Sequence, residues 1–148
     1  MRLTDRIVEL ARSLRKGHLI GRSNASVINS KGTASWKIAI PNDMTRNMQG
    51  EVPIDSNPRT IHSTRAERGA MVGCLWTIMK IAKKYNLQTG SATLCIDNQG
   101  SYKRGGVTAR VEGPCRDLTE NYDYKCIVTK LENKLRTIHN IRIDYAWV

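Results

Sequence analysis

The strongest constraint on the fold is a long amphipathic segment, STRAERGAMVGCLWTIMKIAKKYN, which spans residues 63–86. Four of its residues recur at helical spacing and share one face: Glu67, Met71, Cys74 and Ile78. Ser63 or Thr64 can cap the start, and Glu67 follows Thr64 by three residues, as in a capping box. We therefore expect a helix over 63–86, with Glu67 in its first turn.

The rest of the chain alternates between helical and extended patterns. Two further helices are expected at 4–16 and 118–137, where apolar residues again recur at helical spacing. Strands are expected at 18–23, 33–40, 48–52, 91–96 and 140–148, with a further piece at 60–62. A turn is expected at 29–32, and Pro41, Pro53 and Pro58 break extended segments. Hairpin strands followed by α/β crossovers predict a mixed sheet with helices packed on it.

The charge of the chain favours a polyanionic partner. Lys and Arg total 24 against 13 for Asp and Glu, which gives a net charge of +11. Basic proteins bind nucleic acid because neutralised phosphates release counterions. The alternative is that the charge serves solubility alone.

Hydropathy argues against a membrane protein. No apolar run approaches the roughly 18–20 residues of a membrane span, and the charged N-terminus lacks the apolar core of a signal peptide. We expect an intracellular protein, in nucleus or cytoplasm. The sequence leaves the oligomeric state open.

The cysteines do not form a zinc motif. None of the four belongs to a CxxC pair: Cys74, Cys95, Cys115 and Cys126. We expect small core residues or free thiols.

Two acids have the positions that a hard cation needs. Glu67 lies at the start of the long helix, and Asp97 follows the expected strand 91–96 directly. Oxygen ligands from two rigid elements suit Mg²⁺, which can activate water and neutralise phosphodiester charge. Each acid has a structural alternative: Glu67 can serve the capping box, and Asp97 with Asn98 can form a turn.

Four segments, taken together and in order, resemble the ribonuclease H family, in particular the ribonuclease H-like domains associated with retroelement reverse transcriptases. TRAERGAMVG, starting at Thr64, and GSATLCIDN, starting at Gly90, match the middle of that family. RKGHLIGRSNASVINSKGTASWKI matches its opening, and IRIDYAWV resembles its last strand. The resemblance covers residues 6–148.

The resemblance implies an α/β fold with a mixed five-stranded sheet in the order 3-2-1-4-5 and flanking helices. It also implies hydrolysis of RNA in RNA–DNA hybrids by two Mg²⁺ ions that four carboxylates hold. The second acid falls on Glu67 and the third on Asp97, whereas Asn24 stands at the first position and the fourth would lie beyond Val148. An amide offers an oxygen without a charge, so we expect a weakened metal site and impaired hydrolysis.

Basic and polar residues near these acids are candidates for contacts to phosphate or sugar. They are Arg65, Asn98, Lys103 and Arg104, with ordinary solvated side chains as the alternative. Tyr102 and Trp76 could stack on bases, although a helical Trp more often packs in a core.

The expected organisation is an N-terminal helix at 1–17 followed by a ribonuclease H-like domain at 18–148, which is incomplete at its C-terminus. Without a terminal helix over the sheet, Ile141, Ile143 and Trp147 are expected to be poorly covered. Three functions remain open: a degraded hybrid ribonuclease, a non-catalytic nucleic-acid-binding module, and a decayed retroelement fragment.

Overall fold

The computed structural model describes residues 3–28, 31–41, 43–54, 63–96 and 122–147. The helices are α1 (Leu3–Lys16), α2 (Ser63–Lys84) and α4 (Tyr122–His139). The strands are β1 (Leu19–Ile28), β2 (Lys31–Ile40), β3 (Asp43–Ile54), β4 (Gly90–Ile96) and β5 (Ile141–Trp147). The expected order of helices and strands is confirmed.

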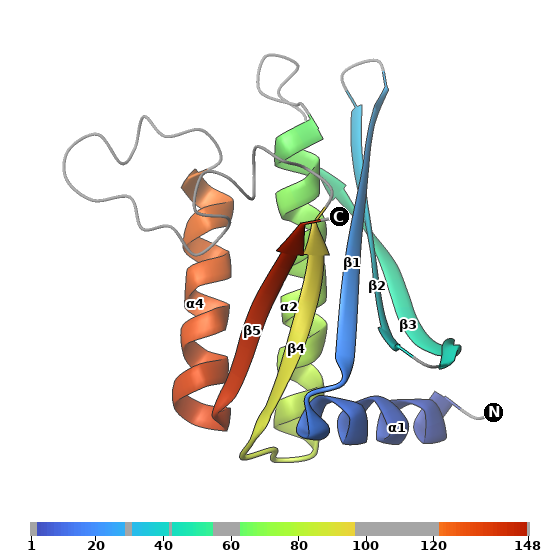
Figure 1. Ribbon diagram of the computed structural model, residues 1–148. Coiled ribbons are helices and arrows are strands. Elements are labelled where there is room, and N and C mark those ends of the chain that lie inside the picture. The colour runs from blue at the N-terminus through green and yellow to red at the C-terminus, as the bar shows by residue number, and fades with distance from the viewer. Residues whose placement is uncertain (1–2, 29–30, 42, 55–62, 97–121, 148) are drawn as a thin grey trace.

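The strands form one five-stranded sheet in the order β3-β2-β1-β4-β5, as the resemblance implied. The β1–β2 and β2–β3 pairs are antiparallel, whereas β4 runs parallel to both β1 and β5. Figure 1 shows β1, β4 and β5 pointing the same way, with α2 running in the opposite direction behind them. The sheet is therefore mixed, with the parallel pairs reached by helical crossovers.

The core lies between the sheet and one helical layer, formed by α2 and α4 (Figure 1). Alternate strand residues point into this layer, including Leu19, Ile38, Leu94 and Ile141, all of which are buried. They meet the buried stripe of α2, which contains Met71, Cys74, Leu75 and Ile78. The buried residues recur with period two in the strand segments and with helical period in α2. These two periods explain why the segments form strands and a helix.

The indole of Trp36 sets how closely α2 approaches the sheet. Gly73 in α2 and Gly50 in β3 both lie against this ring. A Cβ added to Gly73 would lie 2.3 Å from Trp36 Cδ1, and one added to Gly50 would lie 2.7 Å from Cζ2. Both glycines are therefore required for close approach, and the ring is held from two sides.

Helix α1 packs across the end of the sheet where β1 and β4 begin (Figure 1). Leu10, Ala11 and Leu14 enter the same core as the sheet residues, so the expected apolar face of this helix is confirmed. The helix ends at Gly17, whose φ of +79° is a left-handed conformation that glycine tolerates best.

Two strands are longer than expected. β1 continues through Asn24 to Ile28, and its pairing with β2 supplies hydrogen-bond partners along this whole length. β3 runs through Pro53, which pairs with Thr33, because β3 lies at an edge of the sheet where a missing N–H is tolerated. The expected strand piece at 60–62 lies outside the described residues.

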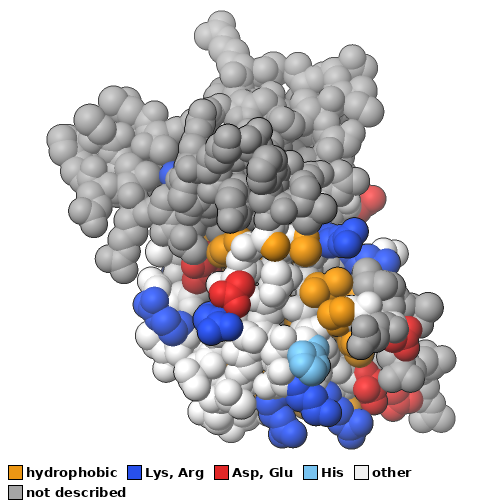
Figure 2. Space-filling model, viewed as in Figure 1, with side chains coloured by type: hydrophobic (Ala, Val, Ile, Leu, Met, Phe, Trp, Pro, Cys, Tyr) orange, Lys and Arg blue, Asp and Glu red, His pale blue; other side chains and the backbone are white. Residues whose placement is uncertain are grey.

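On the sheet face opposite α2 and α4, Figure 2 shows charged side chains toward the lower edge together with several hydrophobic side chains. The expectation that Ile141 and Ile143 are poorly covered is wrong. Ile141 is buried and Ile143 packs against the core, because both point toward the helices. Their neighbours Arg142 and Asp144 point outward and form an ion pair of 3.1 Å.

No helix in the described parts of the chain is both long and apolar enough to span a membrane.

Candidate nucleic-acid and metal site

The predicted site residues that the structure describes, Asn24, Arg65 and Glu67, lie toward one end of the sheet. β1 and β4 run toward this end in parallel, and α2 begins there (Figure 1). Asn24 lies in β1 and Glu67 near the start of α2, while Asp97 follows Ile96, the last residue of β4, in the sequence. Carboxyl ends of neighbouring parallel strands are where open α/β sheets carry functional groups.

One contact shows how α2 is positioned along β1. The Cys74 thiol donates to the Arg22 carbonyl oxygen at 3.6 Å, and Gly21 leaves room for that sulfur. Glu67 precedes Cys74 by two helical turns, or about 10.5 Å, and Asn24 follows Arg22 by about 6.7 Å along the strand. Both displacements run toward the same end of the sheet, so Asn24 and Glu67 both lie toward that end.

The structure describes the backbone of three predicted site residues. Asn24 pairs with Ser35 of β2, and Arg65 and Glu67 lie in α2. The expectation that Glu67 occupies the first turn is wrong, because α2 already begins at Ser63 and no acid lies in its first turn. Thr64 therefore lies inside the helix and not at the position before its first residue.

The remaining predicted residues lie outside the described parts of the chain: Asp97, Asn98, Lys103 and Arg104, together with Tyr102. No group of three or more His, Cys, Asp or Glu side chains that could hold a metal occurs among the residues that the structure describes.

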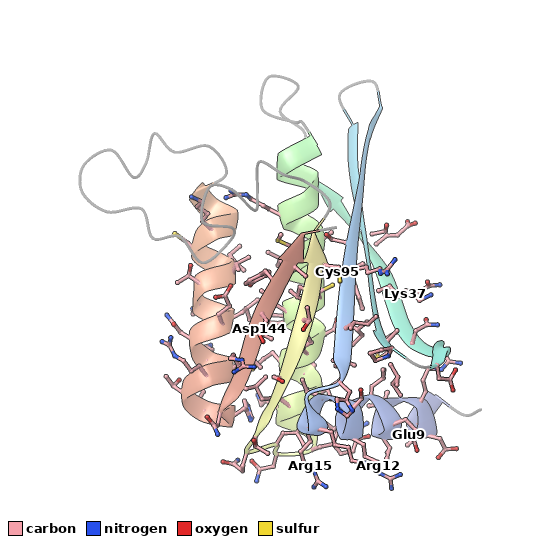
Figure 3. The ribbon with its side chains drawn as sticks, viewed as in Figure 1. Glu9, Arg12, Arg15, Lys37, Cys95 and Asp144 are labelled. Atoms are coloured by element: carbon pink, nitrogen blue, oxygen red, sulfur yellow. The ribbon has the colours of Figure 1, made fainter. Side chains whose placement is uncertain are left out.

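Sequence reasoning did not single out two cations that lie close to the Asn24 position. Arg22 and Lys37 face each other across the β1–β2 pair, on the sheet face opposite α2. Lys37 and Cys95, which both flank Arg22 in neighbouring strands, are seen at a similar level in Figure 3. Gly21 precedes Arg22, and Ile38 follows Lys37. Because Gly21 and Ile38 both face the core, the period-two alternation of a strand could have identified Arg22 and Lys37 as an outward pair.

Trp76 is exposed instead of packed in the core. It is 52% exposed on α2, and Lys80 Nζ lies 5.8 Å from the centre of its ring. Because α2 packs its buried face on the sheet, Trp76 belongs to the outer surface of the helical layer. It is therefore separated from Arg22 and Lys37 by the core.

Among the described residues, one half-buried polar pair has shifted pKa values. The Tyr145 hydroxyl donates to Glu132 Oε1, joining β5 to α4. Burial raises the pKa of Glu132 above its usual 4.5, while the Tyr145 hydrogen bond and Arg136 act in the opposite direction. Burial, followed by the nearby Glu132 charge, raises the pKa of Tyr145 far above its ordinary range. This pair joins sheet and helix on the core side.

No family model matches the sequence, and no curated protein matches it. Solved structures match in fold. Ribonuclease H1 of the archaeon Halobacterium salinarum is 12% identical with a TM-score of 0.55, over 89% of this chain and 86% of that one. LC11-RNase H1, solved in complex with an RNA/DNA hybrid, is 11% identical with a TM-score of 0.58, over 88% of this chain and 84% of that one.

A viral protein matches as well. The prototype foamy virus protease-reverse transcriptase is 12% identical with a TM-score of 0.52, and 89% of this chain covers 18% of that one. At these identities the likeness establishes the fold. The chain has a ribonuclease H-like fold, of the kind found both in ribonuclease H1 and within this reverse transcriptase.

Proposed function

We propose that this protein is a ribonuclease H-like nucleic-acid-binding domain, related to Mg²⁺-dependent hydrolysis of RNA in RNA–DNA hybrids, with impaired hydrolysis. The observation that supports it best is the placement of Asn24 and Glu67 toward one end of the sheet, the end toward which β4 runs. The net charge of +11 suits a polyanionic partner, which we take to be an RNA–DNA hybrid or a duplex.

The donor set suits magnesium chemically but carries little charge. Asn24, Glu67 and Asp97 would supply oxygen ligands, which Mg²⁺ prefers. When bound, the ion would activate water and neutralise charge on the phosphodiester. Because Asn24 supplies an oxygen without a charge, we expect weaker metal binding than a third carboxylate at this position would give.

A non-catalytic binding module is the second candidate, and Asn24 is the observation that favours it. Without a charged ligand at that position, the fold keeps its basic surface while hydrolysis is lost. Arg65, Asn98, Lys103 and Arg104 would then contact phosphate or sugar without cleavage following. A decayed fragment with no present function would show neither metal binding nor salt-dependent binding of nucleic acid.

Magnesium calorimetry on the unmodified chain and three variants tests the metal site. We expect Asn24→Asp to tighten Mg²⁺ binding and Glu67→Gln to weaken it. Glu9→Gln, which removes a carboxylate from α1 at the other end of the sheet, should leave binding unchanged. Equal Mg²⁺ affinity in all four proteins would refute the proposed metal site.

A cleavage assay separates the two candidates. We expect the unmodified protein to cleave an RNA–DNA hybrid weakly or not at all in Mg²⁺ or Mn²⁺. Robust cleavage that Glu67→Ala abolishes would refute the impaired state and establish an active enzyme.

A further inference from the structure

On the sheet face opposite α2 and α4, one row of side chains contains two positive charges and no negative charge. Strand register places Gln49, Lys37, Arg22, Cys95 and Ala146 side by side across all five strands. In the adjacent row, Asp144 is bound to Arg142 at 3.1 Å. Among the described residues, no ion pair involves Arg22 or Lys37.

The juxtaposition of Arg22 and Lys37 lowers the stability of the folded protein. Residues directly opposite on antiparallel strands have Cβ atoms about 4.5–5.5 Å apart, and like charges at this distance repel each other. Arg22 is exposed and Lys37 half-buried, so solvent reduces the repulsion without removing it. An anion placed between the two side chains would turn this repulsion into attraction to both.

The two cations line an open hollow of about 720 Å³ on this face. Ser35 and Gln49 supply polar groups, Glu51 supplies one opposing charge, and the β2–β3 region, including Trp36 and Gly50, completes the lining. Arg, Lys, Ser and Gln are residue types that contact nucleic-acid phosphates. The shallow, open form suits a chain that passes over it.

The hollow lies beside the candidate site. Ser35, which pairs with Asn24, also lines it, and Asn24 follows Arg22 by two residues, or about 6.7 Å of strand. Each nucleotide of a nucleic-acid strand rises by about 3.4 Å. A sugar-phosphate backbone held at Arg22 and Lys37 would therefore pass the Asn24 position within one or two nucleotides.

We propose that Arg22 and Lys37 form a phosphate-binding site for the backbone of a nucleic-acid strand, with Ser35 and Gln49 as additional donors. The site lies on the sheet face opposite the helical layer and extends the candidate site along β1 and β2. This inference rests on the proposed nucleic-acid function and names part of the surface that serves it.

The test compares two double variants that remove equal charge. Arg22→Gln/Lys37→Gln removes the proposed site, and Lys130→Gln/Lys134→Gln removes two exposed lysines from α4, on the other side of the sheet. Binding of a fluorescent RNA–DNA hybrid is followed by anisotropy between 50 and 200 mM salt, without divalent metal. Thermal unfolding of each free protein is measured in parallel.

We expect the first variant to lower the slope of log K against log salt by about 1.8 and to weaken binding by tens-fold at 0.1 M salt, since each phosphate contact contributes about 0.9 to the slope. Its melting temperature should equal or exceed that of the unmodified protein, because the repulsion is gone. The α4 variant should bind with a smaller loss.

Three results would overturn the inference, and they are distinguishable. If the unmodified protein binds with a salt-dependent affinity and the first variant binds equally well, the phosphate site is wrong while the proposed function stands. An equal loss in the α4 variant would mean that only net charge matters. Absence of binding by the unmodified protein would refute the proposed function together with this inference.

Discussion

Substitution of Gly73 by alanine tests the packing that positions α2, and with it Glu67, over β1 and β2. The new Cβ would lie 2.3 Å from Trp36 Cδ1 and 2.6 Å from Nε1, whereas ordinary contact begins at 3.4 Å. Trp36 cannot withdraw toward β3, because Gly50 already lies against its far edge. The helix must therefore move away from the sheet by about 1 Å, since 3.4 minus 2.3 is 1.1.

The energetic balance follows from two opposing effects. Overpacking of a close contact costs up to about 3 kcal/mol, whereas Gly→Ala in a helix interior gains about 1 kcal/mol. We expect Gly73→Ala to lower the free energy of unfolding by about 2 kcal/mol. In a Trp36→Leu background the clash is absent, so the same substitution should raise it by up to about 1 kcal/mol.

Urea unfolding followed by far-UV circular dichroism measures all four proteins of this cycle. The reversal of sign between the two backgrounds is the expected result, with a coupling free energy of about 3 kcal/mol. A neutral or stabilising Gly73→Ala in the unmodified background, or the same effect in both, would show that Trp36 does not limit the approach of α2.

Three further predictions concern stability. Ile78→Ala should lower the free energy of unfolding by about 2–5 kcal/mol, because the side chain is fully buried against the sheet; a loss under 1 kcal/mol by urea unfolding would contradict this core. Gly17→Ala should cost about 1–2 kcal/mol, because φ is +79° and its Cβ would lie 2.7 Å from Ser91 Oγ; an unchanged melting temperature would argue against the left-handed conformation. Since burial raises the folded-state pKa of Glu132, the free energy of unfolding should fall as pH rises from about 4.5 through that pKa. In Glu132→Gln this fall should be smaller, and identical pH profiles would show that the carboxyl is not buried.

The order of elements was predictable because each long segment has a clear period. The buried stripe of α2 and the alternation of Ile141 with Arg142 in β5 are both visible in the sequence. The order of the strands came from the resemblance to a family, because periodicity does not say which strands pair. The length of β3 was missed because Pro53 breaks a central strand and is tolerated in an edge strand.

The candidate site was predictable only in part. Residue types and spacing identified Glu67 and Asp97, and the resemblance identified Asn24. The placement of Asn24 and Glu67 toward the same end of the sheet depends on how α2 packs along β1. The contact of Cys74 with Arg22, which joins residues far apart in the sequence, shows this packing. The Arg22–Lys37 pair was missed for the same reason, since it follows from the register between two strands.

We propose above all that this ribonuclease H-like domain binds nucleic acid through phosphate contacts. The most direct test of this proposal is the anisotropy of a labelled RNA–DNA hybrid titrated with the unmodified protein in chelator, at several salt concentrations between 50 and 200 mM. We predict binding at low salt whose affinity falls linearly with log salt, as phosphate contacts require. Absence of binding at 50 mM salt, or an affinity that does not change with salt, would contradict it.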